Sequence, residues 1–361
     1  MKVEKPCVLG IETSCDDTAC AVVDGSGTVV TSVVSSQLDA HREFGGVVPE
    51  IASREHLSNW PAVSEEVLER AGIGWADVDV VAATHGPGLI GSLLVGLSIA
   101  KALAYGLGRP FLAVHHLEGH LYSPFLKAPG EPAETIPESF DGLVVSGGHS
   151  ALYRVAGGEI QTVAETRDDA MGEVFDKVGK RLGLPYPQGP LVDELAEAGR
   201  PGRFALPIAR LRDGGLDFSF SGLKTQTIRA VEQLEREGVE TGLGKLGDSY
   251  LAAPAEVTGL LADFREAAVG QILERLSRLY DAEPFDLLAV SGGAAANRLL
   301  RRELPSWASQ RGVDLRLVPL QYSGDNAAMI AHAALLRHRR GEADDPLAAE
   351  AKSRIPMGAS G

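Results

Sequence analysis

Short apolar runs that end at polar or glycine-rich turns dominate the hydrophobic pattern of this chain. Near the N-terminus, the runs Val8–Glu12, Ala19–Val23 and Val29–Ser35 alternate with polar turns, and the tetrapeptide from Asp24 to Gly27 is typical of a hairpin. The pattern therefore predicts a meander of three strands at the start of the chain.

Helices and strands then alternate. We expect a helix over Ser58–Ala71, a strand over Val78–Ala83, the turn Gly86-Pro87-Gly88 and a long helix from Leu89. Glycine, serine and lysine interrupt the apolar stretch from Leu89 to Leu107, whereas a membrane span needs ~20 predominantly apolar residues, so we interpret it as a buried helix. The alternation is typical of an α/β protein.

The second half of the chain repeats this theme. A strand at Gly142–Val145, a turn containing two glycines, and a strand at Ala151–Val155 reproduce the order strand, polar turn, strand of the N-terminus. A helix, a strand, a helix, a strand and a helix are then expected at about Glu256–Tyr280, Asp286–Val290, Ala294–Leu304, Asp314–Val318 and Asp325–Arg340. The repetition predicts a duplicated α/β fold.

The length of 361 residues exceeds what one hydrophobic core usually holds, so we expect two lobes with a cleft between them. The proline-rich and acidic segment Lys127–Glu138 is interpreted as the connection. We predict a first lobe over residues 1–140, to which a helix at 325–340 returns, a second lobe over 141–324, and a disordered tail over 341–361.

The formal net charge of -15 predicts that the surface as a whole repels nucleic acids, so an RNA substrate would need help in docking. The basic clusters around Arg298 to Arg302 and Arg337 to Arg340 would supply only part of a footprint. No cysteine pair has a metal or redox spacing, and no export signal is visible, so we expect reduced thiols and a cytoplasmic protein that is not bound to a membrane.

Two histidines have the spacing of metal ligands. On a helix, His116 and His120 project from one face, whereas His115 is rotated away, and Glu118 lies about 200° from His116, unlike the general base of a zinc-protease helix. Asp325, in a turn before a helix, is the candidate carboxylate ligand. Such a set suits iron, zinc or manganese. The alternatives are ordinary surface or core histidines and an aspartate that only caps its helix.

Two glycine pairs follow β-like runs, at Gly147-Gly148 and Gly292-Gly293. Glycines let backbone N–H groups approach a phosphate, although most such pairs are ordinary turns. Asn297, in the first turn of the next helix, could bind a base or ribose or could be a plain surface residue. An acidic run from Asp168 to Asp176 could hold ribose hydroxyls or magnesium, or could be a solvated face.

Seven motifs together resemble the TsaD family, the bacterial tRNA N6-adenosine threonylcarbamoyltransferases once called glycoproteases. The matching motifs are Ile11 to Thr18, Gly45 to Glu50, His115 to His120, Ser146 to His149, Phe175 to Lys177, Phe218 to Thr225 and Ser291 to Arg298. The resemblance runs in order from about Val8 to about Arg340. One departure is Gln188, at a position where the family usually has glycine.

The resemblance implies an actin-like and Hsp70-like two-lobed fold, known as the ASKHA fold, whose cleft holds a metal on His116, His120 and Asp325. The metal would be Fe²⁺, or Zn²⁺, with Mg²⁺ accompanying the nucleotide. Asp16 is the candidate to orient the attacking amine or to accept its proton, and its alternative role is to cap a turn. Threonylcarbamoyl-AMP is implied at Val144, Val145, Ser146, Gly147, Gly148, Asp176, Gly189, Asp193 and Asn297.

The implied reaction transfers the threonylcarbamoyl group to N6 of adenosine 37 in tRNAs that read codons beginning with adenine. The implied protein partners are a smaller paralogue, TsaB, and an ATPase, TsaE. Three other functions stay open from the residues alone: a sugar-kinase or Hsp70-type ATPase, a metallopeptidase, and a non-catalytic nucleotide-sensing scaffold. The position of Glu118 argues against the peptidase.

Overall fold

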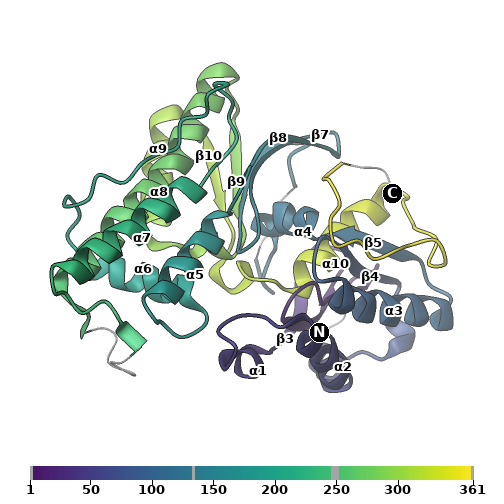
Figure 1. Cartoon of the computed structure of the whole chain (residues 1–361). Helices are drawn as coiled ribbons and strands as arrows, with labels where there is room; N and C mark the ends of the chain where they lie inside the picture. The colour runs from purple at the N-terminus through teal and green to yellow at the C-terminus, as the bar shows by residue number, and fades with distance from the viewer. Residues whose placement is uncertain (1–2, 132–134, 245–251, 359–361) are drawn as a thin grey trace. The chain divides into compact units, whose positions relative to one another are not determined.

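The structure is a computed structural model that describes residues 3–131, 135–244 and 252–358. The chain forms two compact units, one comprising Met1–Glu138 with Val318–Gly361 and the other comprising Ser139–Leu317 (Figure 1). The C-terminal part of the chain thus belongs to the same unit as the N-terminal part. The boundaries lie a few residues from those expected from the sequence.

The first unit contains a five-stranded mixed sheet with the order β3-β2-β1-β4-β5. Its strands are β1 (Val8–Glu12), β2 (Asp17–Val23), β3 (Val29–Ser36), β4 (Val80–Gly86) and β5 (Phe111–His115). The first three strands are antiparallel, as the predicted meander requires, and β4 and β5 add in parallel. Strand β5 was not predicted from the sequence.

Helices cover both faces of this sheet. They are α1 (Leu38–Arg42), α2 (Pro49–Ala71), α3 (Ile90–Leu107), α4 (His116–Tyr122) and α10 (Ala327–Arg339), with short 3-10 turns at Trp75–Asp77, Ser123–Phe125 and Leu320–Tyr322. Leu9 and Ile11 of β1 pack in a core with α2 and α3, whereas Gly10 between them faces α10. A Cβ atom on Gly10 would lie 2.4 Å from the Ala327 carbonyl oxygen, so glycine permits the close approach of α10.

The second unit repeats the first sheet with the order β10-β9-β6-β7-β8. Its strands are β6 (Ser139–Val145), β7 (Ser150–Ala156), β8 (Glu159–Glu165), β9 (Leu287–Ser291) and β10 (Asp314–Leu317). Again three strands form an antiparallel meander and two add in parallel. The duplicated, actin-like and Hsp70-like α/β fold expected from the sequence is confirmed.

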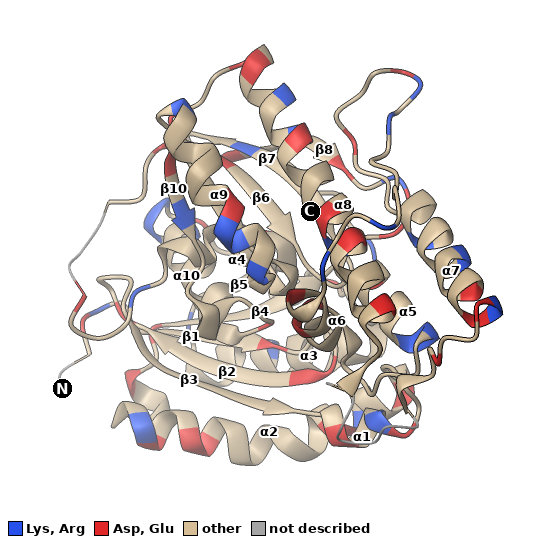
Figure 2. Ribbon diagram, turned by 90° about the vertical axis from the view of Figure 1, so that its left-hand side faces the viewer, with Lys and Arg blue, Asp and Glu red and all other residues tan. Residues whose placement is uncertain are grey.

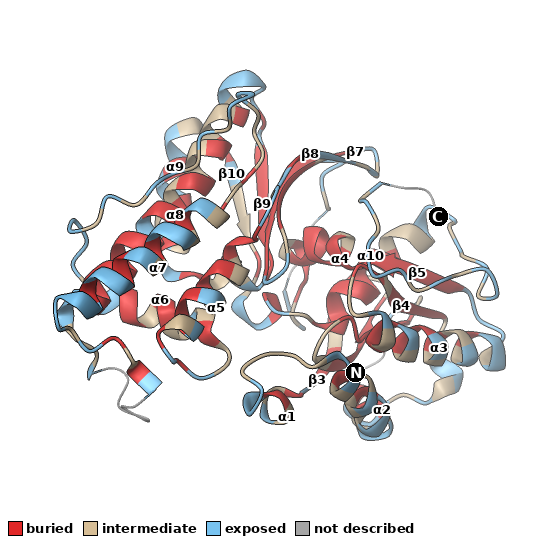
Figure 3. Ribbon diagram, in the orientation of Figure 1, coloured by how far each residue is buried: buried red, intermediate tan, exposed pale blue. Residues whose placement is uncertain are grey.

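The helices of the second unit are α5 (Met171–Arg181), α6 (Gln188–Ala198), α7 (Ser221–Arg236), α8 (Ala255–Ala282) and α9 (Arg298–Arg311), and a 3-10 turn at Gly293–Ala296 precedes α9. The buried residues lie on the sheet and on the helix faces that pack against it or one another (Figure 3). Helices α6 and α7 and strand β8 were not predicted, and α2 begins at Pro49 rather than at Ser58.

Helix α3 is, among the described residues, the one helix whose length and composition would allow it to cross a membrane. In this fold it packs against α2 and β4, and its buried residues include Leu93, Leu97 and Ala100. The helix therefore contributes to the core of the first unit, as the interrupted apolar pattern predicts.

The disordered tail predicted for residues 341–361 is wrong for the part that the structure describes, which extends to Gly358. The Lys101 ammonium donates to the Ala349 carbonyl oxygen at 2.9 Å, and the Lys352 amide donates to the His85 carbonyl oxygen at 2.8 Å. The segment is thus attached to the first unit by its backbone. Composition suggested disorder because the segment has few apolar side chains.

Candidate metal centre and nucleotide pocket

The short helix α4 carries both candidate histidine ligands. It starts directly after β5, and the Nδ1 atom of His115, its N-cap, accepts a hydrogen bond from the Leu117 amide at 3.1 Å. One helical turn separates His116 from His120, and their ring centroids lie 4.7 Å apart. Both side chains are buried. The i, i+4 spacing therefore brings two imidazoles together, while His115 serves as the cap.

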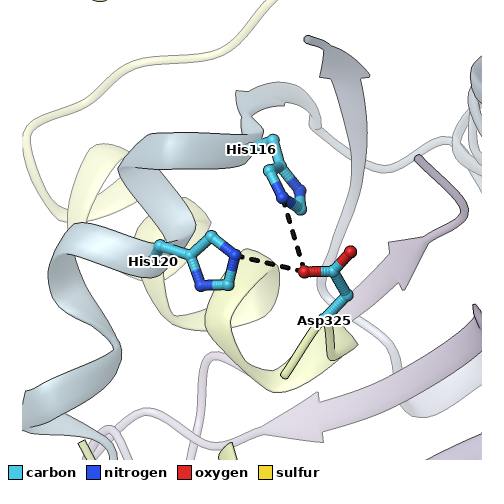
Figure 4. Close-up of side chains that lie close together, drawn as sticks. All are labelled: His116, His120 and Asp325. Carbon is cyan, nitrogen blue, oxygen red and sulfur yellow. Dashed lines mark hydrogen bonds and ion pairs between the residues drawn. The ribbon is translucent and has the colours of Figure 1, made fainter. Parts of the chain in front are cut away.

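The third candidate ligand, Asp325, precedes α10 but does not cap it. The N-cap is Asn326, whose side-chain oxygen accepts from the Met329 amide at 3.0 Å, so the capping alternative for Asp325 is wrong. The Oδ1 atom of Asp325 lies 3.1 Å from Nε2 of His120 and 3.5 Å from Nε2 of His116 (Figure 4). The carboxylate therefore faces both imidazoles.

The spacing of these three side chains fits a metal ion. Their ligand atoms all lie within 4.8 Å of one another. Two ligands at ~2.1 Å from one ion, at 90–110°, are themselves roughly 3.0–3.4 Å apart, which is close to the separations between Asp325 and the two histidines. Two histidines and one carboxylate occupy three positions and leave others open for a substrate. The cluster could thus hold a catalytic metal ion.

A buried carboxylate orients His116 through Nδ1, the ring nitrogen that does not face Asp325. Glu12 ends β1, and its side chain is 1% exposed. Its Oε2 atom lies 3.1 Å from Nδ1 of His116 and accepts from the Thr84 hydroxyl at 2.5 Å, and its Oε1 atom accepts from the Ser14 amide at 2.5 Å. With Nδ1 held by Glu12, the Nε2 atom of His116 is directed toward Asp325, as in carboxylate–histidine–metal arrangements.

Glu12 was missed as a functional residue from the sequence, where it appeared only as part of a motif. The feature of the sequence that could have indicated its role is a carboxylate at the end of an otherwise apolar strand. The Nδ1 atom of His120, by contrast, is buried without a partner in the described part of the chain.

The carboxylates around His116 set its protonation in the absence of a metal. Burial alone would lower the pKa of His116, but the charges of Asp325 and Glu12 outweigh it and raise that pKa to about 9. Burial would raise the pKa of Glu12, but His116 lowers it overall. The pair is therefore an ionic one, and a cation in place of the imidazolium proton would be favoured by the same carboxylates.

Glu118 lies on another side of α4. Burial raises its pKa to about 7, and the charged groups near it are on Arg337, Arg340 and the following residues rather than on Asp325. Glu118 therefore does not take the position of a peptidase general base, as its spacing from His116 predicts.

Asp16 lies in the turn between β1 and β2, two residues after Ser14, whose hydroxyl is 3.2 Å from Nδ1 of His116. Its carbonyl oxygen accepts from the Gln37 amide at 3.0 Å, and its side chain is half-buried. Burial, followed by the charge of Asp16, raises the pKa of the neighbouring Asp17 to about 7. Asp17, the first residue of β2, is close enough to Asp325 and Glu12 for their charges to contribute to this rise in its pKa.

The second unit contains a pocket of about 420 Å³, which is within the range of small-ligand sites. Its lining consists of Gly147, Met171, Gly172, Phe175, Asp176, Pro187, Gly189, Pro190, Asp193, Gly293, Ala294, Ala296, Asn297 and Arg298. Five of the predicted adenylate residues belong to this lining: Gly147, Asp176, Gly189, Asp193 and Asn297. The other four, Val144, Val145, Ser146 and Gly148, do not line it.

Those four residues belong to the end of β6 and the turn that follows it. Val144 and Val145 are fully buried strand residues. Ser146 is engaged in the turn, where its amide donates to the His149 carbonyl oxygen at 2.8 Å and its own carbonyl accepts from the Gly172 amide at 3.2 Å. A Cβ atom on Gly172 would lie 2.6 Å from that carbonyl oxygen, so glycine allows α5 to start against the turn.

Three helices begin at this pocket. Met171 and Gly172 open α5, Gly189 and Pro190 lie in the first turn of α6, and Arg298 opens α9. Helix N-termini present unpaired N–H groups and a partial positive charge, which favours an anionic group such as a phosphate. The pocket thus combines apolar walls, carboxylates and an anion-attracting backbone.

Asp193 connects the elements around the pocket. Its Oδ1 atom accepts from the Asn297 side chain at 2.8 Å and from Arg265 at 3.2 Å, and its Oδ2 atom accepts from the Arg298 amide at 3.0 Å. Asn297 is the N-cap of α9, rather than a residue of its first turn as predicted, because its Oδ1 atom accepts from the Leu300 amide at 3.0 Å. Asp193 and Asn297 therefore hold the rim of the pocket together.

Met171, Phe175 and Arg298 were not predicted as pocket residues. Arg298 and Phe175 belong to motifs that resemble the family, and Arg298 also to a basic cluster, but neither was assigned to the pocket, and Met171 is indistinguishable in sequence from an ordinary core position.

Comparison with known proteins shows which protein family the chain resembles. Residues 28–332 match the family model described as TsaD, tRNA N6-adenosine threonylcarbamoyltransferase. Proteins of that name from Pelobacter propionicus and a Synechococcus species are 47% identical over 326 residues and 45% identical over 358 residues. These alignments cover 90% of this chain and 90% of the first protein, and 97% of this chain and 92% of the second.

Among solved structures, the HypF protein of T. kodakarensis shares the fold, with a TM-score of 0.58 at 13% identity over 94% of this chain and 49% of that one. That likeness supports the architecture alone. The family match and the curated relatives together show that the chain belongs to the TsaD family of tRNA N6-adenosine threonylcarbamoyltransferases, which are tRNA-modifying transferases.

Proposed function

We propose that this chain transfers the threonylcarbamoyl group from threonylcarbamoyl-AMP to N6 of adenosine 37 in tRNAs that read codons beginning with adenine. The observation that carries the proposal is the cluster of His116, His120 and Asp325, whose ligand atoms lie within 4.8 Å of one another in a member of this transferase family. Fe²⁺ is the proposed metal because two histidines and a carboxylate with open positions suit it, and Zn²⁺ is the alternative.

The reaction demands activation, since the exocyclic amine of adenosine is a poor nucleophile whose lone pair is delocalised into the ring. A metal ion held by His116, His120 and Asp325 would act as a Lewis acid toward the carbamoyl oxygen or the leaving phosphate. Glu12 fixes the ring of His116 through Nδ1, so that the ligand atom keeps one orientation. Asp16 is proposed to orient the attacking amine or to accept its proton, given its place in the turn beside Ser14.

The pocket of the second unit is proposed as the site of the adenylate. Its apolar residues Met171, Phe175 and Pro187 suit a purine, and the carboxylate of Asp176 suits ribose hydroxyls. Val144, Val145, Ser146, Gly147 and Gly148 form the strand end and turn at which α5 starts, and Gly189, Asp193 and Asn297 complete the proposed set. A Mg²⁺ ion with the nucleotide would suit the same carboxylates.

Partner proteins are part of the proposal because a chain with a net charge of -15 repels tRNA. The smaller paralogue TsaB and the ATPase TsaE, which the family resemblance implies, would help to dock the tRNA and would act with this chain in the cytoplasm.

Three single variants test the metal assignment. His116→Ala and His120→Ala should each lower the bound metal and the transfer rate together, because both rings face Asp325. His115→Ala is the matched control: it removes the cap of α4, worth ~1 kcal/mol, but no ligand, and should retain most of the metal. Equal loss of metal in all three variants would overturn the assignment.

A further inference from the structure

The C-terminal segment 342–356, here called the C-terminal strap, is held against the first unit at fixed points. The Asp344 amide donates to the Phe111 carbonyl oxygen at 2.8 Å, and the Lys352 amide donates to the His85 carbonyl oxygen at 2.8 Å. A Cβ atom on Gly86 would lie 2.2 Å from the Lys352 carbonyl oxygen, so the strap sits directly on the end of β4. Its position is therefore determined by backbone contacts.

The strap lies beside the supports of the metal centre. The Ser353 carbonyl oxygen accepts from the Gly88 amide at 3.3 Å, and the next amide, that of Leu89, donates to the Ser14 carbonyl oxygen at 2.8 Å. Ser14 also contacts His116. Two residues further along the strap, the Ile355 carbonyl oxygen lies 3.2 Å from Nε2 of His115, the neighbour of a metal ligand.

Two exposed cations project from this part of the strap. Lys352 and Arg354 are exposed, and within residues 3–131, 135–244 and 252–358 no carboxylate pairs with either of them. Many other basic side chains form ion pairs with acidic ones. Basic and acidic residues occur together along α2, α7 and α9 (Figure 2). Lys352 and Arg354 thus lack the ion pairs that many of the described cations form.

The basic clusters that the sequence offered for RNA binding are largely neutralised. Arg337 pairs with Glu342 at 2.7 Å and with Asp344 at 3.2 Å, and Arg340 pairs with Glu342 at 2.6 Å. In the other cluster, Arg302 pairs with Glu197 at 2.9 Å. Glu342 and Asp344, which pair with Arg337 and Arg340, are themselves residues of the strap. Glu350 remains as an exposed acid near the two strap cations.

We propose that Lys352 and Arg354 form a contact for the phosphate backbone of the tRNA substrate, beside the metal centre. The inference rests on the tRNA-modifying function proposed above. Unpaired cations in a chain of net charge -15 give a local attraction for a polyanion, and phosphate contacts position a nucleic acid without reading its sequence. The strap holds them next to the residues that support His116, where the tRNA must present its adenosine.

The test compares two double variants that each remove two exposed positive charges spaced i, i+2. Lys352→Ala with Arg354→Ala removes the strap pair, and Arg210→Ala with Arg212→Ala, in the second unit, is the matched control. Binding of labelled tRNA to the full chain with its partner proteins is titrated against salt. The strap variant should bind about tenfold more weakly at ~0.1 M salt, with a salt slope reduced by about 1.4 to 1.8, since each contact contributes ~0.7 to 0.9.

Kinetics separate this proposal from the proposed function. The strap variant should raise KM for tRNA with kcat unchanged and should bind AMP as the unmodified chain does. Glu350→Gln, which removes the nearby negative charge, should tighten tRNA binding a few-fold. The exchange of Lys352→Arg with Arg354→Lys retains both charges and should restore affinity, which shows that loss of the strap's fold is not the cause.

An unchanged salt slope in the strap variant, or an equal change in the Arg210 and Arg212 control, would overturn the strap contact. Failure of the unmodified chain to modify tRNA at all would instead contradict the proposed function.

Discussion

Replacing Glu12 by glutamine should weaken metal binding without removing any metal ligand. The Glu12 carboxylate accepts three hydrogen bonds, from the Ser14 amide, the Thr84 hydroxyl and the His116 ring. Glutamine keeps one acceptor oxygen and places an amide group, which is a donor, against at least one of these donors. The His116 ring then loses the partner that holds its Nε2 atom toward Asp325.

The size of the effect follows from the role of such outer carboxylates. Mutation of the partner of a metal-ligating histidine typically costs 10–100-fold in metal affinity, or about 1.4–2.7 kcal/mol. The unpaired donors left in a buried site should also lower the free energy of unfolding by roughly 1–3 kcal/mol. Transfer activity should fall with metal occupancy and should recover in part at high metal concentration.

Competition titrations with a chelator, using Zn²⁺ or Co²⁺, measure the affinity directly. Glu118→Gln is the matched control, because Glu118 lies on α4 near Arg337 and its pKa is already raised to about 7 by burial. That variant should bind metal as the unmodified chain does. Unchanged affinity in Glu12→Gln, or an equal decrease in Glu118→Gln, would refute the role assigned to Glu12.

Two further predictions concern stability and the pocket. His332 is buried with both ring nitrogens unpaired in the described part of the chain, and burial lowers its pKa to about 4, so the folded state resists protonation and stability is lost as pH falls from about 6.5 toward 4. Between pH 7 and pH 4.5, the free energy of unfolding should therefore fall by up to about 3 kcal/mol less in His332→Leu than in the unmodified chain. Denaturation at the two pH values measures this difference, and an unchanged pH dependence would contradict the prediction. Asn297→Ala should lose the cap of α9, worth ~1 kcal/mol, and weaken AMP binding because Asp193 loses its partner. Calorimetry of AMP binding checks this, and unaltered affinity would count against the pocket.

The parts of the site that depend on local geometry could be predicted from the sequence. His116 and His120 share a face because one helical turn separates them, and this holds wherever the helix lies. Asp325 lies far along the chain from the two histidines and can approach them only because its segment returns to the first unit. From the residues alone, a metal ligand was one of two possible roles for Asp325, the other being a helix cap. The structure excludes the capping role because the neighbouring Asn326 makes the capping bond, and it places Asp325 beside both histidines.

Features that depend on long-range register could not be predicted. Glu12 meets Thr84 because β1 pairs in parallel with β4, and nothing in the sequence near either residue indicates that pairing. The C-terminal strap was misjudged for a related reason, since its attachment uses backbone hydrogen bonds that any residue can make. Helix α6 was missed because its start, Gln188-Gly189-Pro190, has the composition of a turn.

Mass analysis of nucleosides from tRNA directly tests the proposed transfer of the threonylcarbamoyl group. The tRNA is first incubated with this chain, its metal, threonylcarbamoyl-AMP and the partner proteins. We expect N6-threonylcarbamoyladenosine in tRNAs that read codons beginning with adenine, and its loss with His116→Ala or Asp325→Ala. Steady release of phosphate from ATP by the chain alone, with no modified adenosine in any tRNA, would contradict it.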